Sequence, residues 1–255
     1  MATLADYTKK EFESAFEGIL AELVAVPFLQ TAAFPKAVLL GGQSGAGKST
    51  LHKIFLDVFD KNAIVINGDE YRSKHPRFYK LQEKYGPDSV AHTAEWAGKM
   101  TERLIDALSS MKYNLIIEGT LRTSEVPLKT ATLLTERGYD VSLALMAVKP
   151  EISLISCQIR YEQMRIAGTT PRATDPEYHM AIVEGIVDNL AALEQSPMFS
   201  EIGLYTRNKD CLYPRLGEGR EAHEVLSEVL YGPWTDEEES HYRYLQQYLE
   251  KLKAV

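Results

Sequence analysis

Cysteine is scarce in this chain, and no long hydrophobic run is present. The 255 residues include two cysteines, Cys157 and Cys211, which lie far apart and show no metal-ligand spacing. We expect both to be free thiols in a reducing cytosol. No apolar segment approaches the roughly 20 residues that span a bilayer, and residues 1–6 lack the charged start and apolar core of a signal peptide. These absences predict a soluble cytoplasmic protein without a membrane partner.

Positive charge is also in short supply. Lysine and arginine number 28 against 36 acidic residues, which gives a formal net charge of −8. Binding to a nucleic-acid backbone requires a basic face, and no basic run appears in the sequence. We therefore expect no nucleic-acid partner. The 45% hydrophobic content is ordinary for a globular protein with a buried core, and the length suits one large α/β domain or two small ones.

The most informative segment is residues 42–49, Gly-Gln-Ser-Gly-Ala-Gly-Lys-Ser, which fits the phosphate-binding pattern G-x-x-x-x-G-K-[ST]. In such a loop, backbone N–H groups point at phosphate oxygens, Lys48 binds the β- and γ-phosphates, and Ser49 ligates Mg²⁺. An apolar run precedes the loop at 37–40, and a helical pattern follows at 51–59. This order disfavours a plain glycine-rich turn and predicts a nucleoside-triphosphate site. The expected nucleotide-binding residues are Gly42, Gln43, Ser44, Gly45, Ala46, Gly47, Lys48, Ser49 and Thr50.

Strand and helix patterns alternate along the whole chain. The predicted strands are 37–40, 63–67, 113–118, 141–148 and 202–206. The predicted helices are 7–25, 51–59, 88–111, 126–137, 151–166, 176–195, 220–231 and 236–253. The alternation predicts an α/β fold of the P-loop, Rossmann-like type: a doubly wound, mostly parallel sheet flanked by helices. Ligands bind at the carboxyl ends of the strands in such folds.

Polar residues follow the carboxyl ends of the first three predicted strands, so these ends are expected to line one crevice. Asp69 is placed either to act as the general base on an acceptor hydroxyl or to cap a helix that starts at Glu70. Glu118 is placed either to bind Mg²⁺, directly or through water, or to be a solvated strand end. Arg122 could anchor a diphosphate. Glu102 lies inside a long predicted helix, and its position alone predicts an ordinary surface residue.

Three arginines, Arg160, Arg165 and Arg172, flank the turn-like segment 168–171 between two predicted helices. A helical hairpin that carries arginines resembles the lid that small kinases close over a nucleotide. Cations there would neutralise charge on the transferring phosphoryl group. The competing interpretation is a surface ion pair, for instance between Arg165 and Glu162.

Several longer segments resemble the zeta toxins, the kinase halves of epsilon/zeta toxin–antitoxin modules. They are INGDEYRSKHP at 66–76, YNLIIEGTLRT at 113–123, IRYE at 159–162 and PRAT at 171–174, and the similarity covers at least residues 37–190. The resemblance implies a kinase that uses ATP and Mg²⁺ to phosphorylate the sugar 3′-hydroxyl of UDP-N-acetylglucosamine. The product cannot enter peptidoglycan synthesis. It also implies one P-loop kinase domain over 1–255: an N-terminal helical segment (1–35), a kinase core (36–210) that includes a helical lid, and C-terminal helices (211–255).

Matched motif by motif, the resemblance implies that Lys48 holds the ATP phosphates and that Asp69 is the general base. Arg160 and Arg172 would stabilise the transferring phosphate. The residues implied to contact the sugar nucleotide are Glu102, Glu118, Thr120, Arg122 and Thr130. A small helical epsilon-type antitoxin would obstruct the ATP site, and the free toxin would be a monomer. The N-terminal helix offers a surface for the antitoxin, although its apolar stripe also fits the core.

Two features depart from the family pattern. Glu70-Tyr71 replaces a Ser-Phe pair beside the base, and the turn at 168–171 is short for the family's loop, which bears on the placement of Arg172. Two other functions stay open: a kinase for another acceptor (NAD, another UDP-sugar or an antibiotic alcohol), and an ATP-dependent switch without phosphoryl transfer.

Overall fold

The fold is built on one mostly parallel sheet. The computed structural model describes residues 3–169, 171, 173–214 and 219–255, so Arg172 lies outside the described residues. The strands follow the order β2-β3-β1-β4-β5-β6, and every neighbouring pair is parallel except β5 and β6. The strands are β1 (Lys36–Gly41), β2 (Ile64–Ile66), β3 (Leu115–Glu118), β4 (Asp140–Met146), β5 (Glu201–Tyr205) and β6 (Cys211–Tyr213). The predicted α/β class is confirmed, and β6 adds an antiparallel edge.

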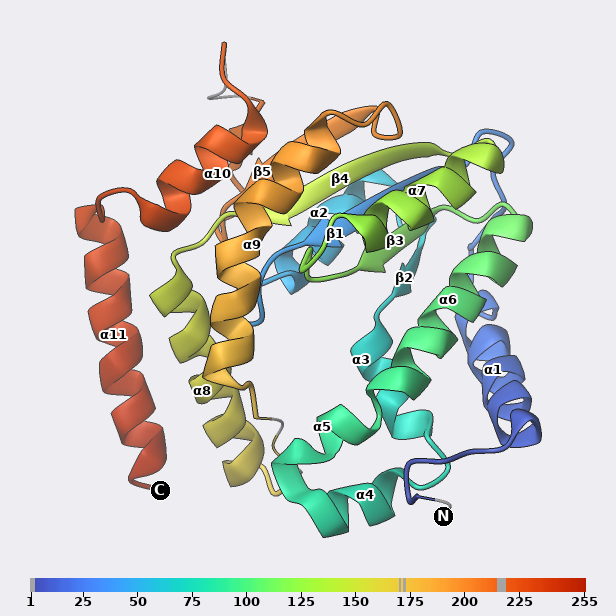
Figure 1. The fold of residues 1–255 in the computed structure, drawn as a ribbon, viewed down its shortest axis with the longest axis horizontal. Coiled ribbons are helices and arrows are strands. Elements are labelled where there is room, and N and C mark those ends of the chain that lie inside the picture. Colours follow the sequence, from blue (N-terminus) through green and yellow to red (C-terminus); the bar gives the residue numbers. More distant parts are fainter. Residues whose placement is uncertain (1–2, 170, 172, 215–218) are drawn as a thin grey trace.

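Helices cover both faces of the sheet (Figure 1). The longer ones are α1 (Lys9–Val24), α2 (Ser49–Val58), α6 (Ala94–Ser110), α7 (Glu125–Glu136), α8 (Pro150–Ile166), α9 (Pro176–Glu194), α10 (Ala222–Tyr231) and α11 (Asp236–Lys253). Alternate β1 residues face opposite layers. Leu39 packs into a core with α1, α6, α7, α9 and α10, whereas Val38 and Leu40 pack into a second core with α2, α8 and α11. The sheet is therefore doubly wound.

Local signals account for several element ends. Thr8 caps α1 and Thr235 caps α11, each through a capping box with a glutamate three residues on. Gly138, at φ +76°, follows the end of α7, close to where the predicted helix 126–137 ends. On α1, which packs against α6, Phe16 and Ile19 are buried in the core cluster, so at least this part of its apolar stripe belongs to the core.

The segment after β2 is more broken than the sequence predicts. The expected helix 88–111 is interrupted at Thr93, whose hydroxyl donates to the carbonyls of Ser89 (3.2 Å) and Val90 (3.3 Å). Such a bond from side chain to backbone competes with regular helix geometry. The short elements here are α3 (Gly68–Tyr71), η1 (Arg72–Lys74), α4 (Phe78–Tyr85), η2 (Gly86–Asp88) and α5 (Ser89–His92). The pattern missed α4 because it buries one residue, Leu81, and missed β6 because none of its residues is fully buried.

In Figure 1, α8 and α9 extend from one side of the sheet, α3 and α6 from the other, and α4 and α5 lie at the bottom of the view. Over the described ranges, none of the helices is both long and apolar enough to cross a membrane. The order β2-β3-β1 places the ends of the first three strands side by side. The expected crevice at these strand ends follows from that order.

Candidate active site

The phosphate loop connects β1 to α2 and is pressed against α8. Gly45 has φ +76°, and a Cβ built on it would lie 2.1 Å from the Ser153 carbonyl oxygen and 2.7 Å from the Cys157 sulfur. A side chain at this position would therefore collide with the α8 backbone and strain the loop. The predicted nucleotide-binding residues 42–50 form this loop and the first turn of α2, which begins at Ser49. Both cysteines are free thiols, as predicted.

Lys48 lies folded over the loop. Its ammonium donates to the carbonyls of Gly42 (2.9 Å) and Gln43 (3.3 Å), and its Nζ is 3.9 Å from Glu118 Oε1. Burial lowers the pKa of Lys48, because the charged form loses hydration, while the carboxylates of Glu118 and Asp69 act in the opposite direction. The lysine thus lies within electrostatic range of both predicted acidic residues.

Glu118 ends β3 directly beside the loop, since it pairs in register with Leu40 of β1. Its Oε2 lies 2.8 Å from Nε2 of His52 on α2, and its side chain is 18% exposed. Glu118 is therefore partly buried between Lys48 and His52, not a freely solvated strand end. His52 was not identified from the sequence, although it lies one turn after Lys48 on the helix that the loop opens.

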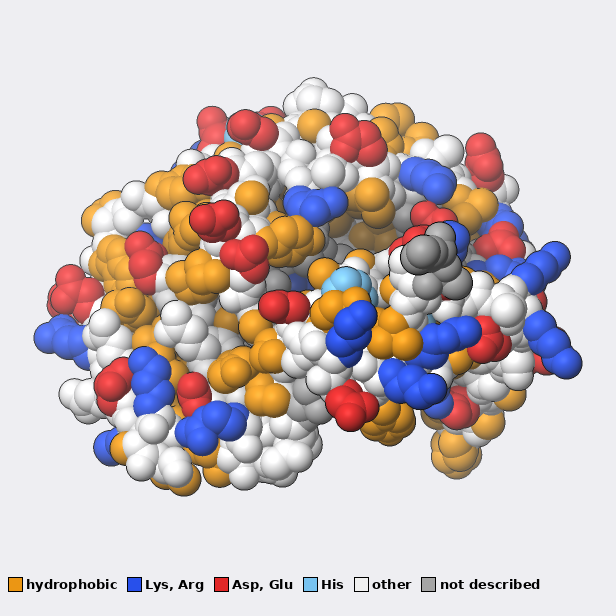
Figure 2. Space-filling model, turned by 60° about the horizontal axis from the view of Figure 1, so that its bottom comes forward, with side chains coloured by type: hydrophobic (Ala, Val, Ile, Leu, Met, Phe, Trp, Pro, Cys, Tyr) orange, Lys and Arg blue, Asp and Glu red, His pale blue; other side chains and the backbone are white. Residues whose placement is uncertain are grey.

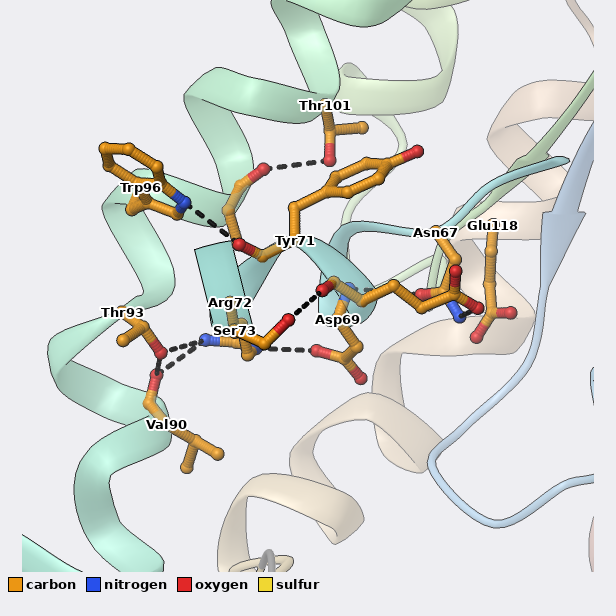
Figure 3. Close-up of polar contacts among 12 residues, drawn as sticks. Asn67, Asp69, Tyr71, Arg72, Ser73, Val90, Thr93, Trp96, Thr101 and Glu118 are labelled. Carbon is orange, nitrogen blue, oxygen red and sulfur yellow. Dashed lines mark hydrogen bonds and ion pairs between the residues drawn. The ribbon is translucent and has the colours of Figure 1, made fainter. Parts of the chain in front are cut away.

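The Asp69 carboxylate is oriented by an arginine (Figure 3). Asn67 caps α3 by accepting the Asp69 N–H (3.1 Å), so the alternative of Asp69 as helix cap is wrong. The Asp69 Oδ1 accepts from Arg72 Nε at 2.7 Å. Arg72 Nη1 in turn donates to the Val90 carbonyl (2.7 Å) and to Thr93 Oγ1 (3.1 Å). The helix break at Thr93 therefore positions the arginine that holds the predicted base.

The residues implied to contact the acceptor are spread over β3, the loop after it, and the helices α6 and α7. The Glu102 side chain is 71% exposed and lies 3.5 Å from Lys129 Nζ on α7. The adjacent Thr130 hydroxyl donates to a carbonyl of its own helix. Thr120 is half-buried, and Arg122 is exposed with its guanidinium 5.4 Å from the ring centre of Tyr178 on α9.

Two of the predicted lid arginines, Arg160 and Arg165, lie on α8. Arg160 is exposed on α8, and its positive charge lowers the pKa of Lys48, so the two cations face the same region. Arg165 Nε lies 2.6 Å from Glu162 Oε2, which confirms the ion-pair interpretation for that arginine. Arg172 lies outside the described residues. Of the two described arginines, Arg160 is the one that acts on the pKa of Lys48.

A buried polar cluster ties the loop to α8 and α9, and sequence reasoning missed it. Gln43, Ser153 and His179 are each 0% exposed. Gln43 Nε2 donates to the Val148 carbonyl (2.9 Å) and to Ser153 Oγ (3.2 Å), and Ser153 Oγ lies 2.9 Å from His179 Nε2. Burial lowers the pKa of His179, which favours the neutral ring. No local pattern marks His179, because its partners come from other elements.

A cavity of about 620 Å³ opens beside the predicted base. Its lining includes Asp69, Arg72, Phe78, Val90, Met164 and Thr169. Figure 2 looks onto this side of the molecule, where the surface is hollowed near its middle and acidic and basic side chains are intermixed. The described lining residues include the predicted base Asp69. They include none of the residues implied to contact the sugar nucleotide.

A glycine-rich loop between β1 and α2 of a parallel sheet, with its lysine bonded to the loop carbonyls, defines a P-loop protein. A model of the zeta toxin family matches residues 22–218. The chain belongs to the zeta toxin family, as the motifs predicted. It is 46% identical over 236 residues to the toxin PezT of Streptococcus pneumoniae serotype 4, covering 92% of each chain. It is 38% identical over 217 residues to a toxin zeta of Streptococcus pyogenes, covering 85% of this chain and 75% of that one.

Solved structures agree with this assignment. A structure from the PezAT chromosomal toxin–antitoxin system of Streptococcus pneumoniae superposes with a TM-score of 0.88 at 42% identity, with 100% of both chains covered. A structure of the AvrRxo1-ORF1:-ORF2 complex superposes with a TM-score of 0.55 at 14% identity, covering 98% of this chain and 87% of that one. The second likeness shows the fold alone.

Proposed function

We propose that this toxin is an ATP-dependent kinase that transfers the γ-phosphate of ATP to the sugar 3′-hydroxyl of UDP-N-acetylglucosamine, in the cytoplasm. The observation that carries the proposal is the placement of Lys48 and Asp69. Lys48 follows β1 and Asp69 follows β2, the two strands that flank β3 in the sheet, and the Asp69 charge acts on the pKa of Lys48. A phosphate-binding cation and a carboxylate base that share one crevice suit phosphoryl transfer to a hydroxyl.

On the donor side, the loop N–H groups and Lys48 bind the phosphates, and Arg160 neutralises charge on the transferring group. Mg²⁺, when bound, would further neutralise the charge on the phosphates. Ser49 and Glu118 would hold it, because Mg²⁺ needs few protein ligands beyond phosphates and water. The two oxygen donors fit this role, because Ser49 opens α2 at the end of the loop and Glu118 ends β3 beside the loop.

On the acceptor side, the hydroxyl oxygen attacks the γ-phosphorus as the bond to the β-phosphate oxygen breaks and ADP leaves. Asp69 accepts the hydroxyl proton. Arg72 keeps the carboxylate pointed at the crevice through its 2.7 Å bond. Arg122 would bind the diphosphate of the acceptor, because a guanidinium can form bidentate hydrogen bonds with phosphate oxygens. Glu102, Thr120 and Thr130 would contact the sugar nucleotide. The phosphorylated product would be lost to peptidoglycan synthesis.

We also propose a small helical antitoxin as partner, one that obstructs the ATP site of an otherwise monomeric toxin. The support is the similarity to PezT and to a structure described as part of a toxin–antitoxin system. The competing functions are a kinase for another acceptor, such as NAD, another UDP-sugar or an antibiotic alcohol, and a nucleotide switch that performs no transfer.

The deciding experiment incubates the full chain with ATP, Mg²⁺ and UDP-N-acetylglucosamine and identifies products by mass spectrometry and NMR. Lys48→Ala and Asp69→Ala serve as matched blanks. We expect a 3′-phosphorylated sugar nucleotide that is absent with both variants. No product, with ATP binding intact, would overturn the acceptor assignment and direct the assay to NAD. Transfer by Asp69→Ala at the wild-type rate would overturn the role of the base.

A further inference from the structure

Arg207 lies shortly after β5, and its guanidinium donates hydrogen bonds to backbone carbonyls of the phosphate loop. Its Nε donates to the carbonyl of Ala46 at 3.1 Å, and its Nη2 donates to the carbonyl of Gly45. The stem crosses Gly47, where an added Cβ would lie 3.4 Å from Arg207 Cγ. The guanidinium thus holds two consecutive peptide groups of the loop from the side opposite to a bound phosphate.

The planarity of the peptide bond gives these contacts a consequence for the loop. Within one trans peptide group the C=O and N–H point in opposite directions. Fixing the carbonyl of Ala46 therefore aims the Gly47 N–H away from Arg207, toward the inside of the loop. The Gly45 peptide is fixed at both ends, because the Ala46 N–H donates to the Gln43 carbonyl at 3.1 Å.

The charge of Arg207 is satisfied in an unusual way. Its partners are backbone carbonyls and the Ser156 hydroxyl, at 3.0 Å from Nη2. Within the described ranges no carboxylate forms an ion pair with it, and burial lowers its pKa. A partly buried cation without a carboxylate partner adds positive potential at the phosphate loop. Ser156 lies one turn before Arg160 on α8, so the same guanidinium also links the loop to the lid helix.

We propose that Arg207 is a positioning residue for nucleotide binding, which shapes the phosphate loop from behind and supplies it with charge. The inference rests on the ATP half of the proposed function and is independent of which acceptor is used. It goes beyond the phosphate-loop pattern, because Arg207 lies 161 residues from Ala46.

The test compares ligands with and without phosphates on the full chain. Binding of ATP is measured by calorimetry and binding of adenosine by NMR titration, for the wild type and for Arg207→Gln. We expect the variant to bind ATP about tenfold or more weakly, as for the loss of a charged hydrogen-bonding group, while adenosine affinity changes less than about twofold. Arg207→Lys keeps the charge without the fork, so its ATP affinity is expected to lie between those of the wild type and Arg207→Gln.

The control is Arg243→Gln on α11, where the arginine is 67% exposed and pairs with Glu239 at 3.3 Å. It is expected to leave both affinities unchanged. Wild-type ATP affinity in Arg207→Gln, or an equal loss for adenosine, would overturn the proposal. If that variant does not fold, as judged by thermal unfolding, Arg207→Lys decides alone: unchanged ATP affinity overturns the proposal. A wild-type protein that binds no ATP would instead overturn the proposed function.

Discussion

Asp69 and Arg72 form a bond of 2.7 Å between Oδ1 and Nε within one turn of chain, and the side-chain end of Arg72 is anchored on Val90 and Thr93. The predicted base is therefore held by Arg72, and Arg72 is itself held by two residues that line the cavity. A carboxylate on a short helix would otherwise sample several rotamers. Orientation of this kind contributes to catalysis when the reacting group must be within one hydrogen bond of the hydroxyl.

We predict that Arg72→Ala lowers kcat about 10- to 100-fold, the cost of a misplaced catalytic group, while the KM for ATP stays within about twofold. The reason is that Arg72 contacts the base but not the phosphate loop. Steady-state kinetics with varied ATP and acceptor measure both constants. Lys74→Ala is the control, since Lys74 pairs with Glu22 at 3.0 Å on the surface. A rise in KM for ATP with unchanged kcat would contradict the positioning role.

Local patterns predicted those parts of the fold whose signals lie close together in sequence. The phosphate loop and the ends of the predicted helices 126–137 and 236–253 each need only a few neighbouring residues. The resemblance favoured the base role of Asp69 and the phosphate-stabilising role of Arg160 over their alternatives, and both roles stay predictions. The crevice at three strand ends was predictable because parallel sheets place their carboxyl ends on one edge.

Other features depend on contacts that no local pattern encodes. Gln43 reaches Ser153 across 110 positions, and Arg207 reaches Ala46 across 161. The break at Thr93 was missed because the apolar spacing continues through it while a hydroxyl diverts the backbone bonds. Side chains that support a site from behind are chosen by packing between elements, so periodicity alone cannot identify them.

Two glycines with opposite surroundings test how closely the loop is packed. Gly45→Ala is predicted to raise the KM for ATP more than tenfold and to lower the free energy of unfolding by about 1–3 kcal/mol, through backbone strain and overlap with α8. Gly18→Ala lies in the middle of α1, where an added Cβ meets nothing within 4 Å. It should stabilise the protein by about 0.5–1 kcal/mol. Chemical denaturation measures the unfolding free energies of both variants, and steady-state kinetics measures the KM for ATP. A Gly45→Ala variant as stable as the wild type would contradict the observed packing.

Acid sensitivity should depend on His179. The Ser153 hydroxyl donates to the Pro150 carbonyl, so Ser153 Oγ is free to accept from the His179 Nε2–H. Burial, with a smaller contribution from the charge of Lys48, lowers the folded-state pKa of His179 below its ordinary 6.5. Below about pH 6.5 the unfolded chain therefore binds the proton more readily, so stability is full above that pH and falls as the pH drops.

His179→Gln should remove this part of the pH dependence. Between pH 6.5 and the folded-state pKa, the slope of unfolding free energy against pH should decrease by up to about 1.4 kcal/mol per unit. Urea denaturation across this range gives the slope. His92→Gln, a histidine stacked on Tyr85 at 3.8 Å between ring centres, is the matched control. His75 and His241, whose pKa values burial also lowers, keep their own contributions. An unchanged slope in His179→Gln would show that His179 does not titrate as inferred.

The contact between Arg122 and Tyr178 separates acceptor binding from ATP binding. The Arg122 guanidinium lies 5.4 Å from the centre of the Tyr178 ring. Arg122 belongs to the loop after β3 and is far from the phosphate loop in sequence. If Arg122 binds the diphosphate of the acceptor, Arg122→Ala should raise the acceptor KM about 10- to 100-fold, the range for a lost charged hydrogen bond. The KM for ATP should not change. Tyr178→Phe keeps the ring face and should be silent, whereas Tyr178→Ala should raise the acceptor KM about two- to fivefold, the exposed cation–π contribution. Arg220→Ala, which removes a surface pair with Glu228, is the control. An Arg122→Ala variant with the wild-type acceptor KM would place the diphosphate elsewhere in the crevice.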